Sequence, residues 1–362
     1  MTTKTPNNQL KLLRLGGSPY DIGYQHGKDG KDGIRDFLNT IIQHGREYFP
    51  GLTREKAIAH VSPSIPFIET YTPHLAKEIA GIAEGAAITI EEAYLIQARA
   101  EFTQISTHEP LIDDGCTSFG IPGEKTEGGE VWVGQNLDLS PIYQGFGIML
   151  HITPDKGPAI LCYSQIGSVA HAGINSAGIG LVINALYSSG WGPGIPRPLL
   201  YRQILERENI DDAVKVVIGA KRASSCNYLF SQPTGRMANL EVTPEHFGLT
   251  EFAGEIVVHT NHYSHPDMIK FEKRPKEKLR NSQFREDRFK QLLSNQIEKL
   301  SLANLKTALT DHQIYPLSVC AHAEGNPWNI ATIASIIAEP AKGQMHVSPG
   351  QGCVNQYATY FI

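Results

Sequence analysis

The sequence predicts an α+β protein in which helices cover β-sheets, and two observations lead to this prediction. Apolar residues recur at helical spacing in the first third of the 362-residue chain, whereas residues 116–244 form short β-type runs separated by glycines. A helical pattern returns after residue 276, and two further apolar runs follow near 329–338 and 344–347. A chain in which helices, strands and helices follow one another in blocks is typical of the α+β class.

Two helices are expected before the pattern changes. In residues 75–85, apolar side chains recur every three or four positions and form one stripe. Thr89 and Glu92 follow with the spacing of a capping box, so a second helix should begin there. Because each helix has only one apolar face, this part of the chain needs the strands to complete its core.

The strands are expected in the middle of the chain, with one helix among them near residues 199–218. A long helix is expected over residues 276–300. Its neighbourhood, residues 270–290, holds nine Lys or Arg against four Asp or Glu. Phe284 and Phe289 give this helix a partial buried face, so we interpret it as a solvated surface helix and not as a nucleic-acid site. The clearest β-type runs are 131–133, 147–152, 180–184 and 228–230.

The bulk composition is that of an ordinary globular protein, with 41% hydrophobic and 19% charged residues. A net charge of −5 and a pI near 6.3 do not favour nucleic acid or an anionic membrane as a partner. The first ten residues hold no apolar signal core, and no run approaches membrane-spanning length. We therefore expect a cytoplasmic protein with no membrane partner.

The cysteines are odd in number, and none forms a Cys-x-x-Cys pair. This pattern suits a reducing compartment and mostly buried thiols better than a disulfide framework. The five are Cys116, Cys162, Cys226, Cys320 and Cys353.

Gly115 and Cys116 lie in a polar segment where the helical third changes to strands. A cysteine is most often a small buried hydrophobe, but a Gly-Cys bond allows another chemistry. Glycine has no Cβ, so its carbonyl can be approached closely and attacked by the neighbouring thiol. Hydrolysis of the resulting thioester leaves Cys116 with a free α-amine of pKa about 8, a base beside its own nucleophile.

Further polar groups accompany this segment, and in their order and spacing the motifs resemble those of the acyl-coenzyme A:6-aminopenicillanate (isopenicillin N) acyltransferase family. That family is a branch of the linear-amide N-terminal-nucleophile (Ntn) hydrolases. The resemblance covers most of the chain and implies a four-layer αββα sandwich. The motifs are SPYDIGYQHG at 18–27, EIAGIAEG at 78–85, DGCT at 114–117, GQNLD at 134–138, NSAG at 175–178 with NAL at 184–186, HTNH at 259–262 and YPLSVC at 315–320.

The resemblance implies roles for individual residues. Cleavage between Gly115 and Cys116 would make Cys116 the N-terminal nucleophile. Asp138 would orient the new α-amine, and Asn261 would donate to the developing oxyanion. Residues 1–115 would become the α chain and 116–362 the β chain of a heterodimer within one Ntn domain. Possible further oxyanion or substrate contacts are Asn184, Gln135 and Asn136.

One departure from the family concerns the stretch that ends at Cys320. Where relatives have an arginine, this chain reads Ala321-His322. A guanidinium that could pair with a substrate carboxylate is missing from that position, and His322 cannot replace a bidentate fork. An acidic, penicillin-like substrate is therefore in doubt, whereas the nucleophile machinery is not.

Other interpretations explain less of the pattern. His259, His262 and His265 recur every third residue, but this spacing fits the ligands of a zinc site on neither a strand nor a helix. His262 could instead serve an internal Cys116 as base, which would leave Asp138 and the scissile glycine without a role. The GxSxG, GxGxxG and P-loop motifs are absent, so we expect no metal and no cofactor.

The prediction is thus a self-processing cysteine Ntn hydrolase that forms an acyl-Cys116 thioester from a small linear amide or thioester. Water would resolve it in an amidohydrolase, and an amine in an acyl-coenzyme A-dependent N-acyltransferase. We favour hydrolysis, because no coenzyme A site is evident in the sequence. A processed but inactive relative that binds a small ligand is a further alternative.

Overall fold

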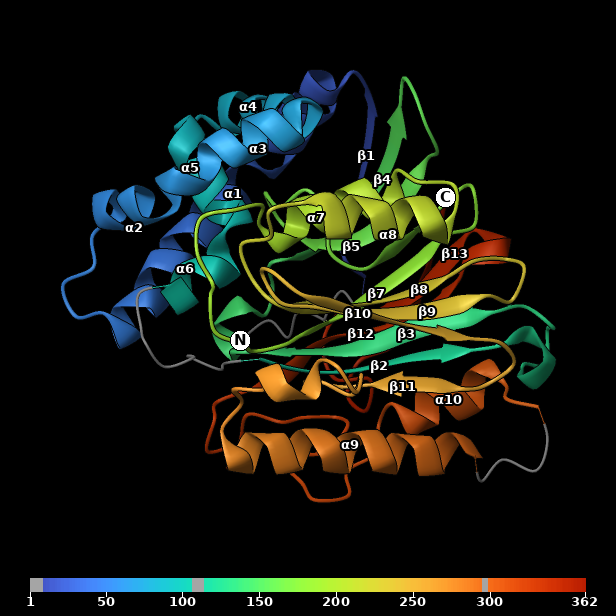
Figure 1. The fold of residues 1–362 in the computed structure, drawn as a ribbon. Coiled ribbons are helices and arrows are strands. Elements are labelled where there is room, and N and C mark those ends of the chain that lie inside the picture. The colour runs from blue at the N-terminus through green and yellow to red at the C-terminus, as the bar shows by residue number, and fades with distance from the viewer. Residues whose placement is uncertain (1–8, 106–113, 295–298) are drawn as a thin grey trace, which may run out of the picture.

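The computed structural model describes residues 9–105, 114–294 and 299–362. Within them, two β-sheets lie face to face, and helices cover both outer faces (Figure 1). This is the four-layer α–β–β–α arrangement that the resemblance implies, so the expected fold class is confirmed. No helix of the described residues is long and apolar enough to span a bilayer.

The larger sheet has the strand order β1-β4-β5-β6-β7-β8-β9-β10. Its neighbouring strands are antiparallel, except that β1 runs parallel to β4. Its strands are β1 (Leu12–Gly17), β4 (Gly147–Pro154), β5 (Ile160–Gln165), β6 (Gly173–Asn175), β7 (Gly180–Ala185), β8 (Cys226–Ser231), β9 (Met237–Val242) and β10 (Phe247–Phe252).

The smaller sheet has the order β11-β2-β3-β12-β13-β14 and is antiparallel throughout. Its central strands contact β7 of the larger sheet, and the shared core lies between the two. Its strands are β11 (Val257–His259), β2 (Asp114–Ile121), β3 (Trp132–Leu139), β12 (Ala331–Glu339), β13 (Gln344–Ser348) and β14 (Ala358–Phe361).

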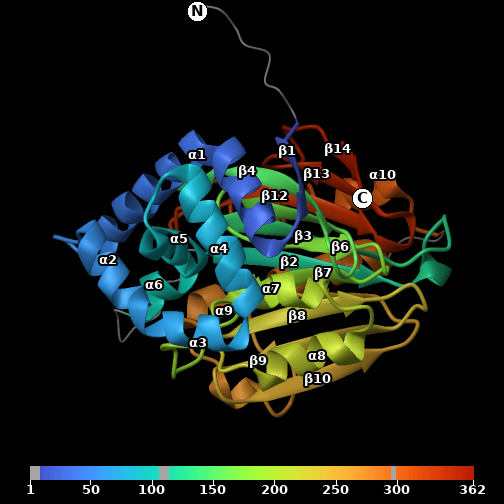
Figure 2. The same cartoon turned by 90° about the horizontal axis from the view of Figure 1, so that it is seen from above.

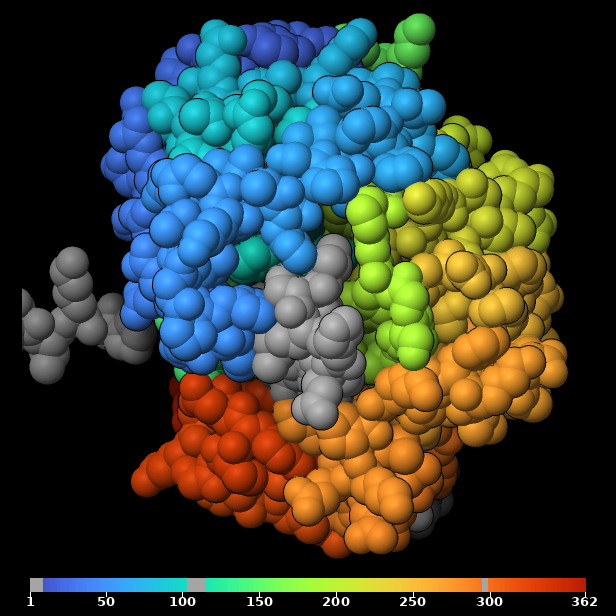
Figure 3. Space-filling model, turned by 60° about the vertical axis from the view of Figure 1, so that its left-hand side comes forward, coloured from blue at the N-terminus to red at the C-terminus, as the bar shows by residue number. Residues whose placement is uncertain are grey.

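The helices form the outer layers and one end of the molecule (Figures 1 and 2). The larger sheet is covered by α7 (Arg197–Leu205) and α8 (Ile210–Gly219), and the smaller by α9 (Lys276–Ser294) and α10 (Leu302–Ala308). In the space-filling view of Figure 3, the blue and cyan atoms of the first third lie against the yellow-green atoms of later segments. The helices of the first third are α1 (Pro19–Tyr48), α2 (Arg54–Val61), α3 (Ile65–Tyr71), α4 (Pro73–Ala86), α5 (Ile90–Gln97) and α6 (Arg99–Ile105).

Two of the family motifs form the contact between α1 and α4. Gly23 and Gly27 of the first motif face Gly81 and Gly85 of the second, and a Cβ on any of the four would collide with backbone of the other helix. These glycines therefore allow the two helices to approach closely. The motifs at 18–27 and 78–85 have a packing function at this contact.

Most expected elements are present, and three differ. The first third is not purely helical, because β1 pairs with β4 at the edge of the larger sheet. The helix expected near 199–218 is two helices, since the Asn209 side chain accepts from the backbone N–H of Asp212 and begins α8. The helix expected over 276–300 is described to Ser294, and residues 295–298 lie outside the described part. The capping box of Thr89 and Glu92 is confirmed at α5.

Candidate active site

Cys116 and Asp138 face opposite sides of the smaller sheet. Gly115 of β2 pairs with Asp138 of β3, and Cys116 pairs with Leu137. Successive side chains of a strand point to opposite faces. Accordingly, Cys116 and Leu137 line a pocket between the two sheets, whereas Gly115 and Asp138 line a second pocket beside α9. The bond between Gly115 and Cys116 therefore connects the two pockets.

The pocket that contains Cys116 has mostly apolar walls where the two sheets meet. Leu137 of β3 and Ile183 of β7 are among the residues that line it. Gln97 of α5 holds a loop that forms part of the lining, since it donates to the Gly167 carbonyl (2.8 Å) and accepts from the Val169 N–H (3.1 Å). The polar residues of its lining are Gln97, Arg99, Gln165, Ser168, His171 and Arg197.

Gly115 approaches the Asp138 carboxylate so closely that a larger residue would not fit without movement. A Cβ at position 115 would lie 3.2 Å from Asp138 Oδ2 and 3.4 Å from Asp138 Cβ. Asp138 is 1% exposed, and its Oδ1 accepts from the Thr332 hydroxyl at 2.6 Å. The Thr332 hydroxyl in turn accepts from the backbone N–H of Ala321 (3.0 Å). The carboxylate beside the predicted cleavage site is thus held by Thr332, which is itself held by the backbone of Ala321.

Asn261 lies on the segment that follows β11 and contacts the backbone of Cys116. Its Oδ1 accepts from the backbone N–H of Cys116 (2.6 Å), and its Nδ2 donates to the carbonyl of Ala185 (3.2 Å). Ala185 lines the pocket that contains Cys116. The amide of Asn261 therefore directs its acceptor to the Cys116 nitrogen and its donor toward the wall of that pocket.

Arg285 of α9 is a site residue that the sequence analysis missed. Its guanidinium is buried, and it donates to the Cys116 carbonyl (2.7 Å), the Thr117 hydroxyl (3.0 Å) and Asn261 Oδ1 (3.0 Å). Asn281, one turn earlier in the helix, accepts from its Nε at 3.0 Å. Arg285 thereby connects the backbone of Cys116 to the amide of Asn261.

The position of Ala321 carries no guanidinium, as expected, but Arg285 brings one to the same pocket from another element. Ala321 does line the second pocket, but Arg285, Arg274 and Lys278 line it as well. The positive charge comes from α9 and the segment before it, instead of from the position after Cys320. The helix is thus more than a solvated surface element.

A sequence signal for Arg285 exists in the spacing of the buried side of α9. Its buried residues follow the three-to-four-residue rhythm of one helical stripe, and Arg285 belongs to that stripe. The high charge of the segment made the stripe hard to recognise. The stripe consists of Ser282, Arg285, Glu286, Phe289 and Leu293.

Three amides that were expected as oxyanion or substrate contacts form hydrogen bonds within the protein. Asn184 Oδ1 accepts from the Ser118 hydroxyl (2.7 Å), and its Nδ2 donates to the His259 carbonyl (3.2 Å). Gln135 Oε1 accepts from the Ile183 N–H at 2.8 Å. Asn136 Nδ2 donates to two carbonyls of the segment around α10. Their hydrogen bonds cross between layers, which suits a positioning role for Asn184 and Asn136, whereas Gln135 Nε2 is buried without a hydrogen-bond partner among the described residues.

The histidines beside Asn261 hold its segment in place. His259 Nε2 lies 3.0 Å from Glu241 Oε1, and the same carboxylate accepts from the N–H and hydroxyl of Ser264. His262 Nδ1 contacts the Ser282 hydroxyl at 2.9 Å. Both contacts agree with the interpretation that these histidines fix the loop by hydrogen bonds.

Two histidines near the nucleophile are weak bases at neutral pH. Burial lowers the pKa of His262 to about 4. His171 lines the pocket of Cys116, and burial lowers its pKa to about 3. A general base works best when its pKa lies near the operating pH. Neither imidazole is therefore well suited to accept the Cys116 proton in an internal Cys-His pair.

Comparisons with known proteins agree with these motifs. The family model of acyl-coenzyme A:6-aminopenicillanic acid acyl-transferase matches residues 125–352. The chain is 29% identical over 322 residues to the acyl-coenzyme A:6-aminopenicillanic-acid-acyltransferase 40 kDa form of Emericella nidulans, across 85% of this chain and 84% of that one. It is 22% identical over 256 residues to the beta-alanyl-dopamine/carcinine hydrolase of Drosophila melanogaster, across 65% of each.

A solved structure of a conjugated bile acid hydrolase variant from Clostridium perfringens aligns with a TM-score of 0.48 and 13% identity, over 68% of this chain and 92% of that one. The family model, which spans more than half of the chain, decides the assignment. The protein belongs to the acyl-coenzyme A:6-aminopenicillanic acid acyl-transferase family.

Proposed function

We propose that the protein cuts itself between Gly115 and Cys116 and then uses Cys116 to open the C–N bond of a small linear amide. The observation that supports this most directly is the arrangement around the Cys116 nitrogen. Its N–H donates to Asn261 Oδ1 at 2.6 Å, and the carboxylate of Asp138 lies beside Gly115 on the other strand. Both groups are in place to hold an α-amine once Gly115 is released.

Self-cleavage would begin with attack of the Cys116 thiol on the Gly115 carbonyl. The C–N bond breaks, the nitrogen takes up a proton to become the α-amine, and Gly115 is held as a thioester on sulfur. Water then cleaves this thioester, which restores the thiol and leaves Gly115 as a carboxylate. Arg285, Arg274 and Lys278 line the pocket beside Gly115 and would stabilise that negative charge.

In turnover, the α-amine of Cys116 takes the thiol proton, and the thiolate attacks the substrate carbonyl. The Asn261 amide is held with its donor toward the pocket wall, because the Cys116 N–H and Arg285 both occupy its oxygen. One N–H of this nitrogen donates to the Ala185 carbonyl, and its second N–H would stabilise the tetrahedral oxyanion. The protonated amine then gives its proton to the leaving nitrogen, and water resolves the acyl-Cys116 thioester.

The acyl part of the substrate is expected to lie in the pocket between the sheets. Apolar walls with a few polar groups are typical of small-molecule sites, and Leu137, Leu139 and Ile183 form part of such a wall beside Cys116. We therefore propose a substrate with an apolar acyl group. The Drosophila relative, named as a hydrolase of beta-alanyl-dopamine and carcinine, supports hydrolysis.

Acyl transfer is a second candidate, and the name of the Emericella relative favours it. The same acyl-Cys116 thioester would then react with an amine instead of water. A competition assay distinguishes the two: an added primary amine should divert the acyl group into a new amide only if the protein is a transferase.

The two segments would stay together after cleavage, because buried ion pairs connect them. Glu101 of α6 accepts from the backbone N–H and Nε of Arg197 (3.1 and 3.3 Å), and Glu78 of α4 pairs with Arg202 at 3.1 Å. All four side chains are at most 7% exposed. We propose a processed heterodimer of 1–115 and 116–362 that remains one domain.

Intact mass under denaturing conditions tests the proposal. Dividing 39.8 kDa in proportion to 115 and 247 residues gives fragments of about 13 and 27 kDa, the larger beginning at Cys116. Cys116→Ala should remain a single chain without activity, whereas Cys162→Ala, which changes another buried thiol, should still be cut. An uncut but active wild type would reject self-processing and indicate an internal cysteine nucleophile. Full activity of Cys116→Ala would reject the nucleophile itself.

A further inference from the structure

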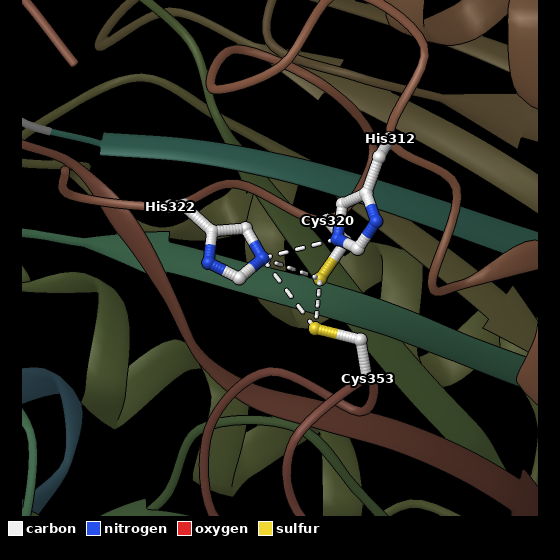
Figure 4. Close-up of side chains that lie close together, drawn as sticks. All are labelled: His312, Cys320, His322 and Cys353. Atoms are coloured by element: carbon white, nitrogen blue, oxygen red, sulfur yellow. Dashed lines mark hydrogen bonds between the residues drawn. The ribbon is translucent and has the colours of Figure 1, made fainter. Parts of the chain in front are cut away.

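Four metal-binding side chains meet at a place that the proposed chemistry does not use. His312, Cys320 and His322 lie on the long loop between α10 and β12, and Cys353 lies on the connection between β13 and β14. Figure 4 shows the two sulfur atoms and the two imidazole rings directed toward a common centre. Their ligand atoms all lie within 4.8 Å of one another.

Four of the six separations between these atoms are close to the edges of a tetrahedron around one ion, and the two between His312 and the sulfurs lie within 4.8 Å. Zn²⁺ binds sulfur at about 2.3 Å and imidazole nitrogen at about 2.0–2.1 Å, so the edges of its tetrahedron are about 3.8 Å between sulfurs, 3.3 Å between nitrogens and 3.6 Å between the two kinds. Here the sulfurs of Cys320 and Cys353 are 3.7 Å apart, and the Nε2 atoms of His312 and His322 are 3.0 Å apart. His322 Nε2 lies 3.4 and 3.7 Å from the two sulfurs.

Hydrogen bonds alone do not account for this arrangement. The Nε2 atom of His322 has three neighbours: the Nε2 of His312 and the sulfurs of Cys320 and Cys353. An imidazole nitrogen carries either one proton or one lone pair, so it can make one good hydrogen bond among the three. A cation at the centre would satisfy all four groups at once.

We propose that His312, Cys320, His322 and Cys353 bind one Zn²⁺ as a structural site. Two thiolates and two imidazoles in tetrahedral geometry are the donor set that zinc prefers, and four protein ligands leave no open position for catalysis. The proposal departs from the expectation of a metal-free protein. It also gives a role to His322, which stands next to the position where relatives have an arginine.

The ion would fasten the loop that supports Asp138. Ala321 lies between two of the ligands, and its backbone N–H donates to Thr332, whose hydroxyl donates to Asp138. Cys320 and His322 are two positions apart on the loop that also carries His312, and Cys353 joins them from another connection. Zinc would therefore hold two separate segments together beside the second pocket.

Metal content of the full-length wild type tests the site. After removal of metal with a chelator under reducing conditions, the protein should bind one equivalent of Zn²⁺ and melt at a higher temperature. Co²⁺ in the same site should show a thiolate charge-transfer band and the intense visible bands of tetrahedral coordination. Cys353→Ser and His312→Gln, both at exposed positions, should lose the stoichiometric binding, the band and the stabilisation.

Matched controls keep the result interpretable. Cys226→Ser and His246→Gln change a cysteine and an exposed histidine elsewhere and should leave one equivalent bound. Circular dichroism of the metal-free variants shows whether each one is folded. The proposal is overturned if the folded wild type binds no Zn²⁺, or if Cys353→Ser binds as much as the wild type. It is also overturned if mass analysis of the native protein shows that Cys320 and Cys353 form a disulfide.

Discussion

The guanidinium of Arg285 lies 2.7 Å from the backbone carbonyl oxygen of Cys116. The same side chain reaches Asn261 at 3.0 Å, so one buried cation orients both the nucleophile's backbone and the amide proposed for the oxyanion. Relatives are expected to supply a guanidinium from the position of Ala321. In this protein α9 supplies a guanidinium that lines the same pocket as Ala321.

Replacing Arg285 tests this relationship. Arg285→Met should slow both self-cleavage and kcat by about 10²-fold or more, because a charge-assisted donor set is lost at the site. Arg285→Lys should recover little, since an ammonium cannot reproduce the planar fork. Arg288→Met is the control, because Arg288 lies on the same helix but pairs with Asp311. A time course of the 27 kDa fragment and steady-state kinetics measure the two effects, and normal processing of Arg285→Met would contradict the assignment.

Asn261→Ala should lower kcat by about 10²–10³-fold with little change in KM, as expected for the loss of an oxyanion donor. The variant should fold, because the segment is still held by His259, Glu241 and Ser264. An Asn184→Ala variant provides the comparison, since the Asn184 amide is occupied by Ser118 and the His259 carbonyl. Equal kcat losses in both variants, measured with the same substrate, would argue against a special role for Asn261.

Asp138→Asn should slow turnover more than Thr332→Val does. The carboxylate is proposed to orient the α-amine directly, whereas Thr332 only holds Asp138 through one hydrogen bond of 2.6 Å. The pH dependence of kcat/KM distinguishes the two roles. Asp138→Asn should lower the pKa of the Cys116 α-amine in the free enzyme, because a negative charge that favours the protonated amine is removed. Thr332→Val should leave that pKa closer to its wild-type value. Identical profiles for wild type and Asp138→Asn would contradict the proposed role.

Gly115→Ala should impair self-cleavage because the new Cβ would lie 3.2 Å from Asp138 Oδ2. Either the Asp138 carboxylate or the backbone of residue 115 must then move, which disturbs the carbonyl that Cys116 would attack. Any protein that is eventually cut should turn over substrate at the wild-type rate per β chain, since residue 115 is not part of that chain. Gly192→Ala is a suitable control, because Gly192 lines neither pocket and its new Cβ would lie no closer than 4.0 Å to any neighbouring atom. Unchanged processing of Gly115→Ala would show that the close approach is not needed.

The buried pair of Glu241 and His259 should make stability depend on pH. Burial lowers the pKa of His259, but the hydrogen bond and charge of Glu241 raise it more, so its pKa lies above the ordinary value. Burial raises the pKa of Glu241, but its bonds to His259 and Ser264 lower it more, so its pKa lies below the ordinary value. The pair is therefore fully charged between these two pKa values.

Each partner sets one limit of this range. The contribution of protonated His259 is present below the ordinary histidine pKa and is lost as pH rises through its raised folded pKa. The contribution of Glu241 is present above the ordinary carboxyl pKa and is lost as pH falls through its lowered folded pKa. Glu241→Gln should destabilise the fold by about 3–5 kcal/mol in between, because one buried partner is left unpaired. Melting temperatures across pH measure the difference in stability between wild type and Glu241→Gln, which should shrink at both the acidic and the basic end of the range. A difference that stays constant with pH would contradict the assignment.

How far the sequence predicts this site depends on whether the residues share a local pattern. Gly115, Cys116, Asp138 and Asn261 belong to short motifs at strand ends, and the structure brings them together. Asn184, Gln135 and Asn136 belong to similar motifs, yet their amides bind other parts of the protein. A motif identifies a polar residue on a strand, but the neighbouring layer determines which groups its side chain meets.

The sequence by itself determined the α+β class, most strands and the capped helix at Thr89, because these depend on periodicity and on neighbouring residues, and its motifs indicated the family. Only the tertiary structure decided that β1 joins the larger sheet, that Arg285 reaches Cys116 across 169 positions, and that His312, Cys320, His322 and Cys353 converge. The physical reason is that such contacts form between layers. Their partners are chosen by packing and burial, which leave little trace in local spacing.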